Sequence, residues 1–427
     1  MVLDTPASGQ QTANANDGGN VTGAAAEQIG IVTTTASAAP TMGGVDEMAT
    51  FLTSGSWGGV TQFFDTSQDN VLTFNVTGLT AEGKQLARWA LESWEVVANL
   101  EFREITGSAD ITFDDNQAGA FANFTTINNR IVHSDVNIST AWLGNSGTGI
   151  GSYSLFTYIH EIGHALGLGH MGAYDGGGTF ASNAIYANDS YQMSVMSYFD
   201  QRENTTINAS YAVPMLPMMV DIVAIQRFYG ASTQTAGDTV WGANTTLTGF
   251  MATLSSNWQN GTFGTGLPIA LTIFDQGGTD LLDLSFSGTG DRIDLRSMQF
   301  SDVGGLIGNV AIARGTVIEK LKAGDGSDHI TGNGASNALF GGGGFDTIYG
   351  GVGFDTVDGG NGRDLVYLED GNDLFVDNAQ SGGWGQDTVF AGGGNDVIRG
   401  GGDNDVFHGQ SGSDAIFAGV GNDKAYG

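Results

Sequence analysis

The chain has 427 residues, and its 46 Asp and Glu against 14 Lys and Arg give a formal net charge of −32 at pH 7. This charge argues against a protein that binds nucleic acid or an anionic membrane, because contacts to phosphate need Lys and Arg. The absence of cysteine excludes disulfide frameworks, Cys-ligated zinc and thiol catalysis. Glycine supplies 69 residues, more than twice the usual share of ~7%. An acidic, glycine-rich chain without cysteine indicates an extracellular protein in which Asp residues bind calcium.

The first 45 residues are rich in Ala, Thr, Gly, Ser and Gln and contain few large apolar side chains. We expect a flexible leader or a short propeptide at 1–45, or a stretch foreign to the natural protein. Residues 1–30 lack the apolar run of a cleaved secretory signal, so export would need another route. The richest apolar stretch, 215–225, is interrupted by Pro217 and Asp221, and we expect no membrane span.

Residues 46–232 read as a mixed α/β domain. Thr80 is a candidate N-cap for a helix that runs to Ala98. Within that helix four residues recur at helical spacing and are expected in the core: Leu86, Ala90, Trp94 and Val97. The pattern predicts strands at 71–76, 100–105 and 109–113, and further helices at 156–167 and 219–229.

The sequence HEIGHALGLGH at 160–170 holds three of the six histidines in the chain. His160 and His164 are four residues apart, so they share one face of a helix and can bind the same Zn²⁺ ion. Glu161 would point beside them, toward a water on the metal. The alternative, a helix with ordinary histidines, is disfavoured by the rest of the motif.

The remainder of the motif contains a glycine and a third histidine. Gly167 can adopt a positive φ, which would end the helix and turn the chain back. The return would bring His170 to the same metal as a third ligand. Three neutral imidazoles leave one position open for water, which is typical of catalytic rather than structural zinc.

The segment SVMSYF at 194–199 has the form of the Met-turn that follows this extended motif. Met196 would form an apolar floor under the three imidazoles. Tyr198, two residues later, would reach the zinc with its phenol. Alone, either residue would be assigned to the core.

Residues 233–427 change character, and from residue 323 the chain repeats with a period of nine. The repeats cover 323–376 and 382–426, with an insertion at 377–381. Position six is Asp in every unit except the one with Asn337: Asp328, Asp346, Asp355, Asp364, Asp373, Asp387, Asp396, Asp405, Asp414 and Asp423. Position eight is apolar: Ile330, Leu339, Ile348, Val357, Val366, Phe375, Val389, Ile398, Phe407, Ile416 and Ala425.

This spacing predicts a parallel β-roll that binds calcium. The glycine half of each unit turns sharply and exposes carbonyl oxygens, and Asp adds the hard carboxylate oxygen that Ca²⁺ prefers. The last three residues of each unit form a short strand whose position-eight side chain points inward. Without Ca²⁺ the rows of Asp repel one another, so we expect binding and folding to be coupled. A disordered glycine-rich linker would not keep eleven units in phase.

Taken together, residues 46–427 resemble the serralysin family of secreted bacterial metalloproteases, within the metzincins. The motifs that carry this resemblance, besides the nonapeptides, are HEIGHALGLGH (160–170), YANDSYQMSVMSYF (186–199), DIVAIQRFYGA (221–231), FDQGGTDLLDLS (274–285) and FSDVGGLIGNVAIARG (300–315).

The resemblance implies an α+β metzincin zinc-protease domain at 46–232, followed by an all-β parallel β-roll of calcium-binding nonapeptides at 233–427. It implies endopeptidase activity on proteins, one catalytic Zn²⁺ and several structural Ca²⁺. By position, the three histidines would be the zinc ligands, Glu161 the catalytic base and Tyr198 a switching fifth ligand. It also implies calcium at the domain junction, on Gly237, Thr239, Asp275, Gly277, Gly278, Asp280 and Glu319.

The chain departs from the family pattern in places. Met171 follows the third histidine, where the family has Pro, and Thr235 and Val317 replace an Arg and a Thr near the junction calcium. The family implies a further C-terminal domain with a type I secretion signal. Because this sequence stops at Gly427, we expect a fragment, a processed form or an unusual export signal.

The substrate is expected to lie extended against an edge strand, and the candidate edge is 119–125, with Gly119, Ala120, Phe121 and Ala122 as contacts. An ordinary strand or loop remains an equal interpretation of that segment. Expected partners are protein or peptide substrates and type I secretion machinery, for a secreted, extracellular monomer. The alternatives are a non-catalytic calcium-binding adhesion or matrix protein, a hydrolase of non-peptide substrates, and an inactive relative of the peptidases.

Overall fold

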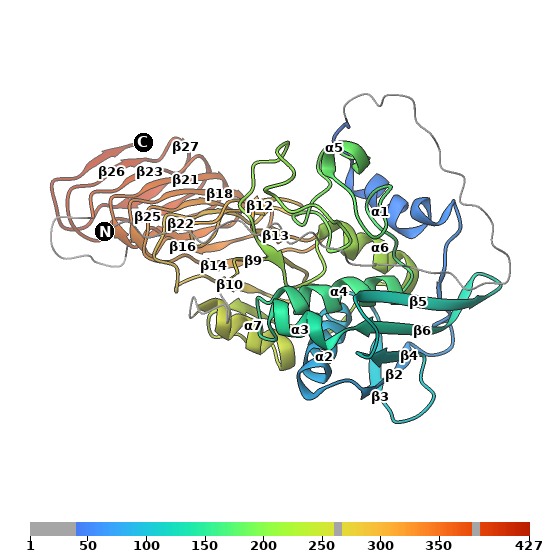
Figure 1. Cartoon of the computed structure of the whole chain (residues 1–427). Helices are drawn as coiled ribbons and strands as arrows, with labels where there is room; N and C mark the ends of the chain where they lie inside the picture. The colour runs from blue at the N-terminus through green and yellow to red at the C-terminus, as the bar shows by residue number, and fades with distance from the viewer. Residues whose placement is uncertain (1–39, 260–266, 378–384) are drawn as a thin grey trace, which may run out of the picture.

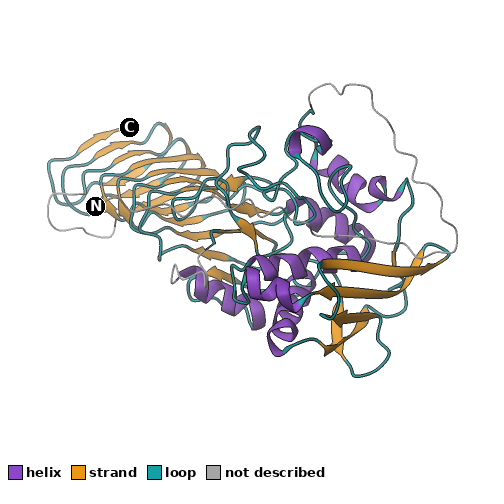
Figure 2. Cartoon of the chain, viewed as in Figure 1, coloured by secondary structure: helices purple, strands orange, loops and turns teal. Residues whose placement is uncertain are grey.

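The structure is a computed structural model that describes residues 40–259, 267–377 and 385–427. One half contains helices and a first sheet, and the other half is a stack of short strands (Figure 1). The two halves lie end to end along the long dimension of the molecule. Nearly all the helix belongs to the first half and its border with the second (Figure 2). The predicted leader lies outside the described residues except for 40–45. Within the described ranges, no helix has the length and apolar character needed to cross a membrane.

A sheet of six strands forms the base of the first half, in the order β1-β6-β4-β2-β3, with β5 paired to β6. All pairs are parallel except β5 with β6. Within the described residues, the antiparallel β5 pairs with β6 alone, so it forms an edge, and it contains most of the candidate edge at 119–125. The three predicted strands are found with small shifts at their ends. The strands are β1 (Phe63–Phe64), β2 (Val71–Gly78), β3 (Glu101–Glu104), β4 (Ile111–Asp114), β5 (Ala120–Ile127) and β6 (Arg130–Ile138).

The predicted helix after Thr80 is present, and Thr80 caps it by accepting the N–H of Gly83 at 3.2 Å. Its predicted end at Ala98 is wrong: the helix ends at Glu95, because Ala98 leaves it to pair with Ala231 in an isolated bridge. The four predicted core positions are all buried. The helices of this half are α1 (Val45–Thr53), the 3-10 helix η1 (Gly55–Trp57), α2 (Ala81–Glu95), α3 (Thr140–Ser146), α4 (Tyr153–Ala165), α5 (Phe180–Asn183) and α6 (Met219–Tyr229).

Helix α4 is the central helix of this half, and almost every side chain on it is buried. It begins at Tyr153, three residues before the predicted start, because Ser152 accepts the N–H of Leu155 and caps it there. It packs against α2, where the indole N–H of Trp94 donates to the carbonyl of Ile159 at 3.0 Å. A helix buried on all sides is held rigidly, which suits it to carry a site.

The second half is a roll of two parallel sheets of eight and nine strands. Thr347 pairs with Leu365, 18 positions later, so one coil takes two nonapeptides and alternate units join alternate sheets. Across the predicted insertion the offset becomes 23, as Leu365 pairs with Thr388, so the repeat keeps its phase. Most of the insertion lies outside the described residues.

The eight-stranded sheet consists of β8 (Val240–Gly242), β10 (Leu281–Asp283), β14 (Lys320–Lys322), β16 (Ala338–Phe340), β19 (Thr356–Asp358), β22 (Leu374–Val376), β25 (Val397–Arg399) and β28 (Ala415–Phe417). The nine-stranded sheet consists of β11 (Arg292–Asp294), β15 (His329–Thr331), β18 (Thr347–Gly353), β21 (Leu365–Gly371), β23 (Thr388–Phe390), β24 (Gly393–Gly394), β26 (Val406–His408), β27 (Ser411–Gly412) and β29 (Lys424–Tyr426). Two glycine-rich turns also pair, as β17 (Gly343–Gly344) and β20 (Asn361–Gly362).

The position-eight side chains form the core of the roll, as predicted. Nine of the eleven, from Ile330 to Phe407, are fully buried. The last two differ: Ile416 is partly buried and Ala425 is exposed. They lie in β28 and β29, which each have a neighbouring coil on one side only. Burial of position eight therefore comes from stacking on both sides, as expected for a solenoid.

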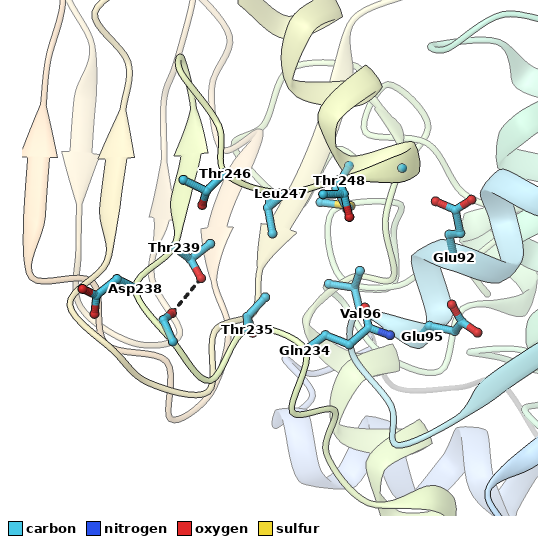
Figure 3. Close-up of a pocket in the computed structure, with 13 residues that line it drawn as sticks. Glu92, Glu95, Val96, Gln234, Thr235, Asp238, Thr239, Thr246, Leu247 and Thr248 are labelled. Atoms are coloured by element: carbon cyan, nitrogen blue, oxygen red, sulfur yellow. Dashed lines mark hydrogen bonds between the residues drawn. The ribbon is translucent and has the colours of Figure 1, made fainter.

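The two halves meet around the helix α7 (Gly249–Gln259) and a small sheet in the order β12-β13-β9-β7. Its strands come from both sides of the junction: β7 (Val213–Pro214), β9 (Ile269–Ile273), β12 (Phe300–Ser301) and β13 (Val310–Ile312). Beside α7 the acidic end of α2 faces the junction loop across a cavity of about 480 Å³, with Glu92, Glu95 and Thr235 among its lining (Figure 3).

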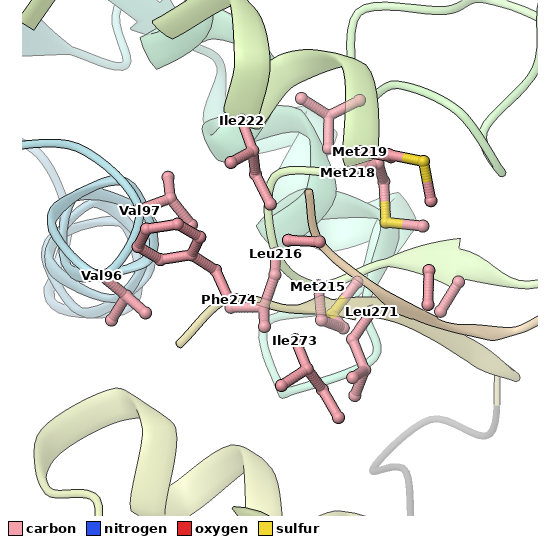
Figure 4. Close-up of a cluster of buried hydrophobic side chains, with 14 of the residues drawn as sticks. Val96, Val97, Met215, Leu216, Met218, Met219, Ile222, Leu271, Ile273 and Phe274 are labelled. Carbon is pink, nitrogen blue, oxygen red and sulfur yellow. The ribbon is translucent and has the colours of Figure 1, made fainter. Parts of the chain in front are cut away.

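A continuous apolar core joins the halves. Phe274, which follows β9, lies against Val96 and Val97 at the end of α2 (Figure 4). Met218 and Leu271 belong to the same cluster and come from opposite sides of the predicted boundary at 232/233. Fully burying one such side chain stabilises by roughly 1.5–3 kcal/mol, so the junction is a packed interface rather than a loose linker.

Candidate active site

The three histidines of HEIGHALGLGH converge as predicted. The Nε2 atom of His164 lies 3.1 Å from that of His160 and 2.9 Å from that of His170. All three side chains are buried, and in the described residues they form the one group of three or more His, Cys, Asp or Glu side chains whose ligand atoms all lie within 4.8 Å of one another. The site therefore gathers three nitrogen ligands at one point.

Backbone carbonyls fix the ring orientation of two of these histidines. Nδ1 of His160 lies 2.7 Å from the carbonyl oxygen of Val195, and Nδ1 of His164 lies 2.8 Å from that of Leu168. A carbonyl can only accept, so each Nδ1 carries the proton and each Nε2 presents a lone pair to the shared point. Three converging nitrogens of this kind fit a zinc ion, which takes neutral imidazole ligands.

The third ligand reaches the site through a sharp turn at Gly167. Its φ is +104°, and a Cβ atom there would collide with the backbone carbonyl of Gln62. The indole of Trp57 donates to the carbonyl of Gly167 at 2.9 Å and holds the turn in place. The prediction that Gly167 ends the helix and returns the chain toward His170 is confirmed.

Glu161 and Met196 are both buried in the same part of the structure. Glu161 follows His160 on α4 and is almost fully buried. Met196 is fully buried under the helix, and a Cβ atom on Gly163 would collide with its sulfur. Met196 thus packs against the same turn of helix that carries the ligands.

The Met-turn is anchored by Asp221, which the sequence reasoning noted only as an interruption of an apolar stretch. Its Oδ1 accepts the hydroxyl of Ser194 at 2.5 Å, and its Oδ2 accepts the N–H groups of Val195 and Met218 at 2.7 and 2.8 Å. Burial raises the pKa of Asp221 to about 6, while these hydrogen bonds act in the opposite direction. The sequence signal that could have identified Asp221 is its place as an acidic residue in the first turn of the helix predicted at 219–229.

Tyr198 lies beside the histidines. Its ring centroid is 4.5 Å from that of His170 and 5.9 Å from that of His160. Tyr174, which the sequence reasoning missed, stacks beside Tyr198 at 4.7 Å. The Tyr174 hydroxyl donates to Asp189, whose carboxylate also accepts the hydroxyl of Ser197 at 2.6 Å. These contacts fix the residue next to Tyr198 and one face of its ring.

The candidate substrate residues at 119–122 belong to β5 or adjoin it. This strand packs against α4, the helix that carries His160 and His164. An edge strand next to these histidines leaves one side of its backbone open to pairing, which is the geometry that an extended peptide would use.

The structure also brings the predicted junction residues together. The N–H of Thr239 donates to Asp280 Oδ1 at 2.7 Å, and the N–H of Asp280 donates to Glu319 Oε2 at 2.8 Å. Asp275 accepts the N–H of Gly277 at 3.1 Å, and Gly278 lies so close to the backbone of Gly237 that a Cβ atom would collide there. All seven residues therefore lie in two stacked loops or directly beside them.

In the repeats, the carboxylates of position six are buried in two stacked rows. One oxygen of each accepts a backbone N–H from the preceding coil; Asp364 Oδ1, for example, accepts the N–H of Asp346 at 2.9 Å. The other oxygen, Oδ2, is buried and has no hydrogen-bond partner among the described residues in Asp328, Asp346, Asp355, Asp364, Asp373, Asp387, Asp396 and Asp405. Asp414 and Asp423, near the last coil, are only partly buried.

Asn337, the exception to the Asp pattern, differs in this respect. Its Oδ1 accepts the N–H of Asn333 at 2.8 Å, and its Nδ2 lies 3.3 Å from the carbonyl oxygens of Ile318 and Glu319. Both the oxygen and the nitrogen of the Asn337 amide therefore have hydrogen-bond partners on the backbone. Buried polar groups without a partner are rare in proteins, so the row of unpaired Oδ2 atoms calls for a cation.

Comparisons with known proteins agree with this geometry. Residues 231–421 match the family model Peptidase M10 serralysin C terminal, and residues 115–212, which contain the three histidines, match the model Peptidase M66. The chain is 37% identical to Serralysin of Proteus mirabilis over 278 residues, which are 60% of this chain and 54% of that protein. It is 39% identical to Serralysin C of Dickeya chrysanthemi over 266 residues, with shares of 58% and 53%.

A third relative, Metallopeptidase AprA of Pseudomonas marginalis, is 35% identical over 316 residues, 69% of this chain and 61% of that protein. The chain thus spans little more than half the length of the first of these curated relatives. The predicted resemblance to the serralysin family of metalloproteases is confirmed.

Proposed function

We propose, on the premise of this likeness to the serralysins, that the chain acts as a secreted zinc-dependent endopeptidase on proteins. The observation that carries the proposal is the convergence of three Nε2 atoms at one point, with two of the rings oriented by backbone carbonyls. His160, His164 and His170 would hold the zinc and leave a position open for water, as in catalytic sites.

When bound, zinc would polarise the scissile carbonyl and make a water molecule more acidic. Glu161 would take a proton from that water as its oxygen attacks the carbonyl carbon. The same carboxyl would then pass the proton to the leaving amine as the C–N bond breaks. Tyr198, with its ring beside His170, would donate a hydrogen bond to the oxyanion.

The substrate chain would lie extended beside β5 and pair with its free edge. Support comes from the position of β5 at the sheet edge and against α4. Residues 119–122 would then contribute backbone contacts, which favour any extended peptide and leave side-chain selectivity to neighbouring loops.

Calcium would be structural and would occupy the roll and the junction loops. The support is the row of buried Oδ2 atoms without partners, together with the carbonyl oxygens of the glycine turns. Calcium prefers such oxygen ligands, and metal binding to sites that form only on folding stabilises the fold directly. We further propose that the protein is exported by type I machinery with its roll unfolded, and folds in extracellular calcium as a monomer.

The decisive experiment is casein hydrolysis by the purified chain with Zn²⁺ and Ca²⁺, beside Glu161→Ala. We expect the variant to lose activity by a factor of about 10² to 10⁴, the usual contribution of general base catalysis, while it keeps one zinc per chain. Glu101→Ala, at an exposed position of the same half, is the matched control and should keep its activity. A Glu161→Ala protein as active as the parent would refute the mechanism.

Tyr198→Phe tests the second group. Loss of an oxyanion donor costs on the order of 10²-fold or more in kcat, while zinc content should hardly change. If zinc content and turnover fell together, Tyr198 would be a structural residue and the oxyanion role would be wrong.

A further inference from the structure

The stacked row of carboxylates behind the nine-stranded sheet continues beyond the predicted repeats. Within the repeats, Asp346 Oδ1 accepts the N–H of Asp328 at 2.8 Å. One coil earlier, Asp328 Oδ1 accepts the N–H of Asp291 at 2.7 Å. Asp291 lies well before residue 323, where the first repeat begins, yet it occupies the next place in the row.

The backbone around Asp291 repeats the hydrogen bonds of the coils that follow. The N–H of His329 donates to the carbonyl of Asp291 at 2.8 Å, and the N–H of Thr347 donates to that of Asp328 at the same distance. Arg292 and His329 are paired in parallel register, like the strands of the repeats. Asp291 is therefore equivalent to Asp328 in backbone position and in hydrogen bonding.

The glycine turn of this coil is equivalent too. The N–H of Asp325 donates to the carbonyl of Ser287 at 2.8 Å, as that of Gly343 donates to Gly324 one coil later at 3.0 Å. A Cβ atom on Gly326 would collide with the carbonyl oxygen of Thr289, just as one on Gly344 would collide with that of Gly326. The carbonyls of Ser287 and Thr289 thus take the places of those of Gly324 and Gly326.

The sequence explains why a search by period misses this coil. Residues 286–294 read FSGTGDRID, which places Asp at position six and Ile293, fully buried, at position eight. Arg292, however, pairs with His329, 37 positions later instead of 18. The 19 extra residues correspond to 295–313 and include β12 and β13, so the unit is out of phase with the other repeats.

The carboxylates of this coil are buried and incompletely satisfied. Asp291 is 3% exposed and Asp328 is 2% exposed, and Oδ2 of each has no hydrogen-bond partner in the part of the chain that the structure describes. Asp291 Oδ1 accepts the hydroxyl of Thr289 at 2.7 Å and the N–H of Gly304 at 3.0 Å. Two buried carboxylate oxygens without partners, between loops that expose carbonyls, form a set of hard oxygen ligands.

We propose that one calcium ion binds between the loops 287–291 and 324–328, at a site outside the eleven nonapeptide repeats. Its ligands are the carboxylates of Asp291 and Asp328 with carbonyl oxygens of the two glycine turns. The site deepens the proposed role of calcium in the roll and rests on it.

This site lies where the roll meets the half that carries the histidines. Asp291 accepts a hydrogen bond from the N–H of Gly304. The loop that follows Gly304 contacts the other half, where the N–H of Ser210 donates to the carbonyl of Ile307 at 2.9 Å. The side chain of Gln192, in the loop that leads to the Met-turn, donates to the carbonyl of Gly308 at 3.0 Å. Calcium at Asp291 therefore braces a loop that supports the zinc-binding half.

The test uses the full chain with Asp291→Asn, a substitution that keeps Oδ1 as an acceptor and replaces Oδ2 with a group that cannot ligate a cation. Bound calcium is counted by mass spectrometry of the metal after dialysis against a series of free Ca²⁺ concentrations. Asp325→Asn is the matched control, because it removes the same charge from the facing loop, 324–328, at an exposed side chain. We expect Asp291→Asn to bind one calcium fewer than the parent and Asp325→Asn to bind the same number.

Equal calcium number and affinity in Asp291→Asn and the parent would overturn the inference. Asp346→Asn, inside the repeats, distinguishes this from failure of the calcium roll: if it loses calcium while Asp291→Asn does not, only the additional site is wrong. A parent that binds no calcium would refute both. If circular dichroism shows that Asp291→Asn does not fold, anomalous scattering from parent crystals grown in calcium decides the question, since a peak between the two loops is required.

Discussion

The two halves prepare their metal ligands in opposite ways. In the helical half, backbone carbonyls accept from Nδ1 of His160 and His164, so the ligands are oriented and hydrogen-bonded without a metal. In the roll, Oδ2 atoms are buried without partners, and burial raises the pKa of Asp346 and of Asp387 to about 8. The first site is a preorganised set of nitrogen donors that suits zinc. In the second, burial disfavours the ionised carboxylates and a bound cation would compensate them, so we expect the roll to gain stability from its proposed calcium.

Removal of calcium should therefore have the largest effect on the fold, and removal of zinc a small one. We expect a chelator selective for calcium to unfold the roll of the full chain, with loss of its strand signal in far-ultraviolet circular dichroism. A chelator selective for zinc should abolish activity and leave the spectrum unchanged. The physical reason is that the roll buries carboxylate oxygens that need a metal for compensation, whereas two of the histidines keep backbone hydrogen bonds when the metal is removed.

Calcium titration back into the chelated protein is the control, and the strand signal should return cooperatively. A roll that stays folded without calcium at neutral pH would remove the difference between the halves. Equal loss of structure on removing calcium and on removing zinc would also contradict the difference between the two halves.

Asp221 sharpens the comparison, because it is a buried carboxylate in the helical half whose two oxygens have partners. It accepts from Ser194, Val195 and Met218 and ties the Met-turn to α6. We expect Asp221→Ala to lower the free energy of unfolding by about 2–4 kcal/mol, since three buried donors lose their acceptor. Urea denaturation at saturating calcium measures this loss.

The control is the same measurement at several calcium concentrations. Because Asp221 is satisfied by protein donors, its loss should not depend on calcium, whereas substitutions of Asp in the roll should. A destabilisation well below 1 kcal/mol, or one that calcium abolishes, would contradict this account.

The contrast between the halves also shows what a sequence can predict. The roll is specified locally: each nonapeptide carries its own turn, Asp and core residue, so the eleven units and their inward position eight followed from the period alone. The unit at Asp291 was missed because an insertion breaks its phase and because Ser287 and Thr289 replace glycines of the repeat, although Asp and an apolar residue keep positions six and eight. The histidines were found because their spacing encodes a helix face and a turn at Gly167.

The supports of the site were not predictable in the same way. Asp221, Tyr174 and Asp189 act through contacts between segments that are distant in sequence, and no spacing rule links them to His160. The end of α2 was misplaced for a similar reason, because Ala98 is drawn out by pairing with Ala231. Tertiary contacts of this kind appear only once the fold brings the segments together.

The smallest expected effect concerns the junction, where Glu95 faces the cavity between α2 and the loop at 234–239 (Figure 3). Burial raises the pKa of Glu95 to about 7, above its ordinary value of 4.5. A raised pKa means that the folded state binds the proton more tightly than the unfolded state. Glu95 therefore favours folding below about pH 4.5, and this contribution is lost as the pH rises through about 7.

Glu95→Gln should remove this dependence, because Gln keeps the oxygen that accepts the N–H of Phe102 and carries no charge. We expect the variant to be more stable than the parent at pH 8, by an amount on the order of 1 kcal/mol after allowance for solvent screening, and equal to it near pH 4. Thermal unfolding across this range at saturating calcium is the measurement. A parent more stable than Glu95→Gln at pH 8 would mean that the ionised carboxylate has a cation or donor in the cavity. The junction would then resemble the roll, where we propose that calcium holds the buried carboxylates, more than the helical half.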